Sequence, residues 1–219
     1  MGATVARQAD WLLFGPVTRV LVVNPASEFF VELQGSPSQR LVRLLQSECA
    51  PRLSPACLRQ QGRHSFENVV SLEKAVVTGI NGGHVHVAST DCPPWRPLFQ
   101  TYYLAVDALV LMLDISSGRT PSEPAKFERA IAQDVEGVRN FLCKFDDWEA
   151  CPLLILCHAT DTESVAFDAE RIRGEIGKCE LRQLPNRVRH FSWSSPSLLP
   201  ELREDLAWLV TAKESMKRS

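Results

Sequence analysis

Apolar residues fall into short runs along the chain, and these runs predict the strands of a sheet. The runs 109–113 and 153–157 are continuously apolar, which is typical of strands buried on both faces. A β-branched run over 17–24 predicts a third strand, which ends before Pro25 because proline has no amide hydrogen to donate. The same pattern predicts further strands at 67–77, 84–89 and 188–193.

Helices and a hairpin are predicted between these strands. Leucines that share one face predict a helix over 39–48, after a break formed by 35–38. The sequence Asn-Gly-Gly at 81–83 lies between two predicted strands and indicates the tight turn of a β-hairpin. Helical spacing of apolar residues also covers 127–145, 166–176 and 198–213.

This order of elements predicts the fold class. Strands that alternate with helices imply parallel βαβ units joined into one sheet. We therefore predict an α/β fold with a single, mostly parallel sheet and helices on both faces. The predicted domain spans 16–213, between an N-terminal extension over 1–15 and a C-terminal tail over 214–219.

Composition excludes several classes of protein. The 219 residues carry a net charge of −2, with 45% hydrophobic and 23% charged residues, so nothing indicates binding to nucleic acid. No apolar run approaches the roughly 18–20 residues that cross a bilayer, and we expect no secretory signal. Gly2 permits myristoylation, although Ala6 stands where Ser or Thr is favoured. We expect no strong membrane attachment and a cytoplasmic or nuclear location.

The cysteines indicate reduced thiols. There are seven of them, an odd number, and none forms a CxxC pair. Disulfides are rare in the cytosol and nucleus, and zinc sites normally need closely spaced ligand pairs, so we predict neither. His84 and His86 share one strand face, which leaves a metal site as an alternative that lacks an evident third ligand.

One segment of the chain resembles a known family. The block 96–103, Arg-Pro-Leu-Phe-Gln-Thr-Tyr-Tyr, leads into the apolar block 106–114. Together they resemble the Arf branch of the Ras-like small GTPases, in which a partner-facing helix follows the second switch and runs into a buried strand. Less specific similarity extends over 28–212. The resemblance implies a small-GTPase-like fold with the topology of P-loop NTPases.

The comparison with this family also shows what the chain lacks. A phosphate loop, GxxxxGK[ST], uses glycine backbone amides, a lysine and a magnesium-binding hydroxyl, and the motif occurs nowhere in the sequence. At the best matching position, Glu32 and Pro37 stand in place of two glycines. Ser38 replaces the lysine, and Gln39 replaces the hydroxyl. The other register, with 24–27 as the loop, supplies no glycine or lysine.

Three aspartates remain as remnants of a nucleotide pocket. Asp91 keeps the acidic position of the second switch, although Pro94 replaces the glycine whose amide senses the γ-phosphate. Asp161 keeps the last position of the base-recognition motif NKxD, which otherwise reads His-Ala-Thr here. Asp114 follows a buried strand. The segment 49–66, where the first switch is expected, contains no threonine.

These losses favour a binding module over an enzyme. We expect a pseudo-GTPase without cofactor or metal ion, which works as an adaptor between other proteins and does not depend on nucleotide. The three aspartates keep a divergent guanine-nucleotide-binding protein as one alternative. Weaker similarity over 41–51, 152–157 and 208–218 to the GTPase-like domain of an F-box substrate adaptor gives another, a substrate-recruiting subunit of a ubiquitin-ligase assembly.

The expected partner surface is the one that small GTPases use for effectors. It comprises the strands within 67–89 and the segment 92–103. Tyr102 matches a tyrosine that Arf proteins present to partners, and packing of some of the aromatic rings into the core is the alternative. Pro93 and Pro94 restrict the backbone, so we expect a face held in one state. Four aromatic residues are of the kind enriched in binding hot spots: Trp95, Phe99, Tyr102 and Tyr103.

Overall fold

The order of strands and helices follows the predicted alternation. The computed structural model describes residues 17–23, 37–49, 72–90, 106–114, 151–158, 174 and 185–216. Six strands and two helices are delimited within these residues: β1 (Val17–Val23), α2 (Pro37–Cys49), β2 (Leu72–Ile80), β3 (Gly83–Thr90), β4 (Ala108–Asp114), β5 (Leu153–His158), β6 (Asn186–Phe191) and α7 (Leu198–Met216).

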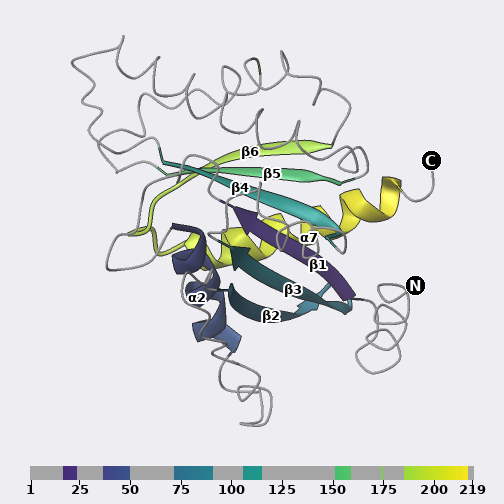
Figure 1. The fold of residues 1–219 in the computed structure, drawn as a ribbon, viewed down its shortest axis with the longest axis horizontal. Helices are drawn as coiled ribbons and strands as arrows, with labels where there is room; N and C mark the ends of the chain where they lie inside the picture. Colours follow the sequence, from purple (N-terminus) through teal and green to yellow (C-terminus); the bar gives the residue numbers. More distant parts are fainter. Residues whose placement is uncertain are drawn as a thin grey trace, which may run out of the picture.

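All six strands belong to one mixed sheet, in the order β2-β3-β1-β4-β5-β6 (Figure 1). The strands β3, β1, β4, β5 and β6 run parallel to one another, and β2 runs antiparallel to β3. β1 lies inside the sheet because β3 and β4 pair with its two sides. The predicted α/β class with a mostly parallel sheet is confirmed, with an antiparallel hairpin at one edge.

The inner strands are buried on both faces, which explains their uninterrupted apolar sequences. Leu109, Leu111 and Leu113 point to one face of β4 and Val110 and Met112 to the other, and each is at most 2% exposed. The residues of β5 from Leu153 to Cys157 are at most 1% exposed. Strands of this kind are typical of parallel sheets that other elements cover on both sides.

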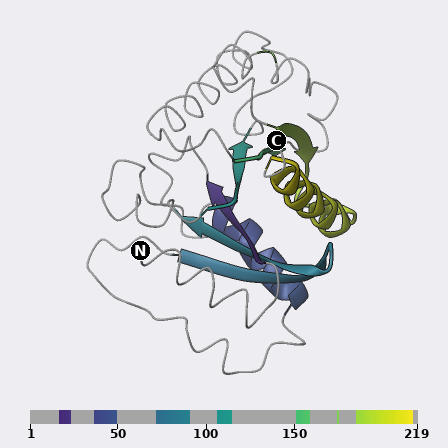
Figure 2. The same cartoon turned by 90° about the vertical axis from the view of Figure 1, so that its right-hand side faces the viewer.

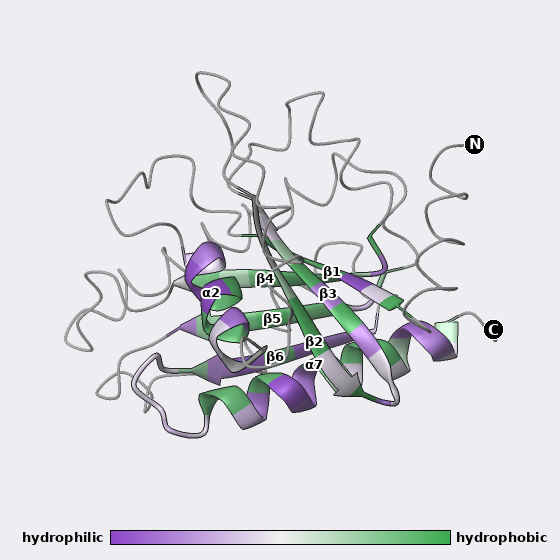
Figure 3. Cartoon of the chain, turned by 90° about the horizontal axis from the view of Figure 1, so that it is seen from below, coloured by the Kyte–Doolittle hydropathy of each residue, from purple (hydrophilic) through white to green (hydrophobic). Residues whose placement is uncertain are grey.

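Both delimited helices lie on the same face of the sheet (Figure 3). Leu41, Val42 and Leu45 of α2 are buried in one core with apolar residues of the sheet, because their spacing places them on one side of the helix. The helices predicted over 127–145 and 166–176 lie outside the described residues, except for the helical Gly174. Helices on the second face therefore stay a prediction. α7 contributes four leucines to the same core: Leu198, Leu202, Leu206 and Leu209.

The β2–β3 hairpin turns at the predicted Asn-Gly sequence. Asn81 and Gly82 have φ values of 48° and 76°, a left-handed conformation that these two residue types adopt most readily. Gly79, with φ of 75°, lies where the register shifts between Thr78 and Ile80, as at a β-bulge. The hairpin tip reaches α7, as the turned view in Figure 2 shows.

Three predicted boundaries are wrong by a few residues. α2 begins at Pro37 rather than at residue 39, because the fixed φ of proline suits the first turn of a helix. α7 continues to Met216, so part of the predicted tail is helical. β6 covers Asn186–Phe191, which leaves Trp193 beyond the strand in a serine-rich turn. The predicted strand residues 67–71 lie outside the described residues.

Candidate functional site

The strand order defines the edge of the sheet at which doubly wound sheets bind their ligands. Counted among themselves and without β2, the five parallel strands follow the order 2-1-3-4-5 of a doubly wound sheet. The order reverses between β1 and β4, and in such sheets ligands bind outside the carboxyl ends of the strands. Val23 and Asp114 end these two strands, and His158 ends the neighbouring β5. We call this side of the sheet the carboxyl edge.

The first turn of α2 holds Ser38 and Gln39, which the sequence resemblance predicts at the positions of the phosphate-loop lysine and hydroxyl. Ser38 and Gln39 are 0% and 4% exposed, so both side chains are buried in the domain. Neither residue carries a positive charge. The guanidinium group of this turn belongs to Arg40, whose side chain is exposed and extends toward the end of β6.

Three rings and this guanidinium group meet at the carboxyl ends of β5 and β6. Arg40 Cζ lies 4.4 Å from the ring centroid of Trp193, within the range of a cation–π interaction. Trp193 contacts Phe191 edge to face at 5.0 Å between centroids and His158 at 5.8 Å, while His158 and Phe191 are 5.4 Å apart. These four residues form what we call the ring cluster.

A serine-rich turn positions Trp193. The Oγ atoms of Ser192 and Ser194 are 2.9 Å apart, and the Ser194 amide donates to Ser192 Oγ at 3.4 Å. The Ser195 amide donates to the Ser192 carbonyl and the Leu198 amide to the Ser195 carbonyl, both at 3.2 Å. The chain therefore bends sharply from β6 into α7, and Trp193 packs against the core beside the sheet.

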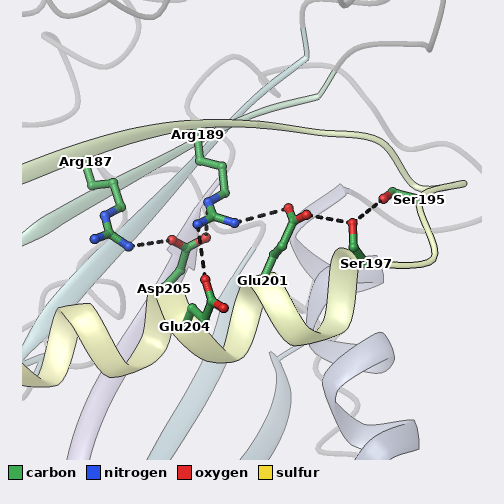
Figure 4. Close-up of polar contacts among 7 residues, drawn as sticks. All are labelled: Arg187, Arg189, Ser195, Ser197, Glu201, Glu204 and Asp205. Carbon is green, nitrogen blue, oxygen red and sulfur yellow. Dashed lines mark hydrogen bonds and ion pairs between the residues drawn. The ribbon is translucent and has the colours of Figure 1, made fainter.

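An ion-pair network joins β6 to α7 (Figure 4). Arg187 Nη1 lies 3.1 Å from Asp205 Oδ1, and Arg189 Nη1 lies 3.1 Å from Glu201 Oε2. Arg189 also approaches Asp205 Oδ2 at 3.1 Å and Glu204 at 3.8 Å. The two arginines are partly exposed, with 35% and 25% of their side chains accessible, whereas Asp205 is fully buried. The network therefore fastens one flank of α7 to the last strand.

Asp205 has an unusual environment within this network. Its Oδ2 lies 3.1 Å from Arg189 Nε, yet it accepts no hydrogen bond of suitable geometry from a described group. Burial raises the pKa of the Asp205 carboxyl above its ordinary value, and the positive charges of Arg189 and Arg187 oppose this shift without cancelling it. The desolvation cost of the charged Asp205 carboxylate is therefore larger than the stabilisation that Arg189 and Arg187 give it.

The opposite flank of α7 fastens the β2–β3 hairpin. Asn81 Nδ2 donates to the Ala207 carbonyl at 3.2 Å and to Thr211 Oγ1 at 3.1 Å. Arg203 Nη2 donates to the Thr78 carbonyl at 3.0 Å. Both contacts involve the end of the hairpin near its turn, so α7 holds the tip of the hairpin against the domain.

Most residues predicted for the pocket and the partner surface lie beyond what the structure describes. Asp114 is the last residue of β4, and its backbone is in register with that of His158 on β5. The remaining predicted residues lie outside the described residues and their positions stay predictions: Asp91, Trp95, Phe99, Tyr102, Tyr103 and Asp161.

The ring cluster is a feature that the sequence pattern did not reveal. Arg40 belongs to a predicted helix and Trp193 to the end of a predicted strand, and no spacing rule connects two such distant residues. A partial signal existed, because the polar sequence Ser-Ser-Pro-Ser at 194–197 indicates a turn directly after Trp193. That signal places Trp193 at the carboxyl edge of the sheet but does not identify Arg40 as the residue that it contacts.

The described residues and the comparisons with known proteins add four observations. In the described part of the chain, no group of three or more His, Cys, Asp or Glu is placed to hold a metal ion. None of the helices delimited there is long and apolar enough to cross a membrane. Cys151 and Cys157 form no disulfide. No protein-family model matches the chain, and the comparison with curated proteins finds no match either.

Proposed function

We propose that the chain is a non-catalytic, small-GTPase-like module that binds other proteins and does not depend on nucleotide. The resemblance of the blocks 96–103 and 106–114 to Arf proteins motivates the family. A parallel sheet with an antiparallel hairpin at one edge, and with α2 after the first strand, is consistent with that fold. The missing phosphate loop motivates the loss of catalysis.

The arrangement at the first turn of α2 is the observation that carries this proposal. A phosphate site at a helix N-terminus uses converging backbone amides, and P-loop proteins add a lysine and a metal-binding hydroxyl. Ser38 and Gln39 supply no charge and are buried. Arg40, the cation of this turn, is stacked on Trp193. These contacts leave the turn without a lysine or arginine directed to a phosphate group.

The anchoring of the hairpin supports a partner surface in one fixed state. Asn81 and Arg203 connect the hairpin to α7 by hydrogen bonds that involve no nucleotide. The expected partner surface includes these strands and the aromatic segment 92–103. A surface held by contacts within the domain binds its partner without a switch, which is the behaviour expected of an adaptor.

A melting experiment tests the independence from nucleotide. The purified chain should melt at the same temperature with and without GTP or GDP and magnesium. A bound ligand at 100 times its dissociation constant would stabilise the folded state by about 2.7 kcal/mol, which a melting curve resolves easily. A clear rise in melting temperature with either nucleotide would contradict the proposal.

Partner capture tests the proposed surface. Proteins that co-purify with the chain should be lost when Trp95→Ala or Tyr102→Ala weakens binding by about 2 kcal/mol, as at a hot spot. Glu214→Gln, an exposed change near the end of α7, serves as the control and should keep every partner. Circular dichroism of each variant separates a binding defect from unfolding. Two folded variants that retain all partners would place the interface elsewhere.

A further inference from the structure

The ring cluster joins the first turn of α2 to the carboxyl ends of β5 and β6, on one side of the place where the strand order reverses. Ligands in doubly wound sheets lie at the carboxyl ends of the strands, and the N-terminus of a helix faces them. In this chain the first turn of α2, the end of β5 and the end of β6 all contact one side chain, Trp193. The contacts come from Arg40, His158 and Phe191.

These contacts are of the kind that hold a planar aromatic ligand. A guanidinium group lies over one face of the indole ring at 4.4 Å from its centroid. Phe191 meets Trp193 at an interplanar angle of 89°, and His158 is tilted against it at 45°. Stacking by a cation and packing by ring edges are the interactions that bind flat, electron-rich groups.

We infer that Trp193 is a built-in occupant of the carboxyl edge, and that its indole ring takes the place of a diffusible planar ligand. The inference rests on the proposed function and extends it, because it identifies what lies beside the position of the lost base-recognition motif. His158, the last residue of β5, stands at the first position of that motif, and it contacts the indole ring. At the β5–β6 side of the carboxyl edge, the aromatic ring therefore belongs to a residue of the chain itself, Trp193.

Replacement of the indole side chain by a free indole molecule tests this inference. Trp193→Gly should melt at a lower temperature than the unaltered chain, and added indole should raise the melting temperature of the variant in a dose-dependent manner. Indole at ten times its dissociation constant would multiply the folding equilibrium constant by about tenfold. The unaltered chain should not respond, because its own ring occupies the position. A folded Trp193→Gly variant that does not respond to indole overturns the inference.

A second measurement decides the matter even if Trp193→Gly does not fold. Arg40→Ala should lower the folding equilibrium constant about two- to fivefold when Trp193 is present, the range of an exposed cation–π interaction. The same change should have no measurable effect in a Trp193→Leu background, which keeps an apolar residue at this position. Arg43→Ala, an exposed change one turn further along α2, is the matched control and should act equally in both backgrounds. Equal effects of Arg40→Ala in both backgrounds overturn the inference.

The outcomes separate this inference from the proposed function. Stabilisation of the unaltered chain by GTP or GDP contradicts the proposed function, whatever indole does. Suppose instead that indole does not stabilise Trp193→Gly, that Arg40→Ala acts equally in both backgrounds, and that nucleotides do not change the melting temperature. These results contradict the inference about Trp193 and leave the proposed function intact.

Discussion

The two flanks of α7 are fastened to the sheet by different chemistry. The flank toward β6 uses charges: Arg187 and Arg189 face Glu201 and Asp205. The flank toward the hairpin uses hydrogen bonds to neutral acceptors, two of them backbone carbonyls, on Thr78 and Ala207. The β6 flank therefore depends on ion pairs between two charged partners, whereas the described contacts of the hairpin flank include none.

This difference matters for the expected partner surface. Screening by salt weakens exposed ion pairs, whereas the hydrogen bonds of the Asn81 amide involve no charged group that salt could screen. The hairpin that belongs to the expected partner surface is held by the second kind of contact. We therefore expect its position to stay constant under conditions that loosen the β6 flank.

The largest loss of stability is expected from a change at the C-terminal end of α7, beyond both flanks. Lys213 Nζ lies 3.0 Å from Asp107 Oδ1, with only 11% and 13% of the two side chains exposed, and Asp107 Oδ2 accepts the Arg19 amide at 2.9 Å. Asp107→Ala should lower the free energy of unfolding by about 3 kcal/mol, because it removes the carboxylate that lies against a largely buried lysine. Urea denaturation measures the loss, and Asp107→Asn should lose less because it keeps an acceptor for Arg19. A loss near zero would mean that the flanks alone hold α7.

A smaller effect is expected on the hairpin flank. Asn81→Gly removes both hydrogen bonds to α7 but keeps a residue that tolerates φ of 48°. It should lower the free energy of unfolding by about 1 kcal/mol. Denaturation at low and high salt should give the same loss. A loss that shrinks strongly with salt would remove the distinction between the two flanks.

The β6 flank should show a weaker, salt-dependent effect. Arg189 and Glu201 are 25% and 36% exposed, so Glu201→Gln should cost about 0.5 kcal/mol at low salt. The cost should fall toward zero in 1 M salt, where charges are screened over about 3 Å. Glu204→Gln is the control, since this side chain is 72% exposed and lies 3.8 Å from Arg189. An effect of Glu201→Gln that salt leaves unchanged would show that charge does not hold this flank.

The smallest effect is expected in how the free energy of unfolding depends on pH. Because burial raises the pKa of Asp205, the folded state binds the proton more tightly than the unfolded state. The stability that Asp205 contributes is fully present below about pH 3.8 and is lost as the pH rises through the higher pKa of the folded state. The difference in unfolding free energy between the unaltered chain and Asp205→Asn should therefore decrease across this window. A difference that grows with pH would show that the two arginines outweigh burial.

Local sequence patterns were sufficient for most of the fold. The apolar runs 109–113 and 153–157 correspond to β4 and β5, and the Asn-Gly sequence forms the predicted turn. These features depend on residues that are neighbours along the chain, so a short stretch of sequence is enough to predict them. Boundaries were less certain, as Trp193 shows, because the end of a strand depends on the turn that follows.

The contacts that define the candidate site required the three-dimensional arrangement. Arg40 stacks on Trp193, and Asp205 faces Arg187 and Arg189, because the order of strands in the sheet brings α2, β6 and α7 together. The sequence alone does not distinguish a charged residue that is buried against a partner from one that is exposed to solvent. The absence of a phosphate-loop motif is visible in the sequence because that chemistry needs fixed residue types at fixed spacing. The ring cluster has no such spacing, and only packing between distant segments creates it.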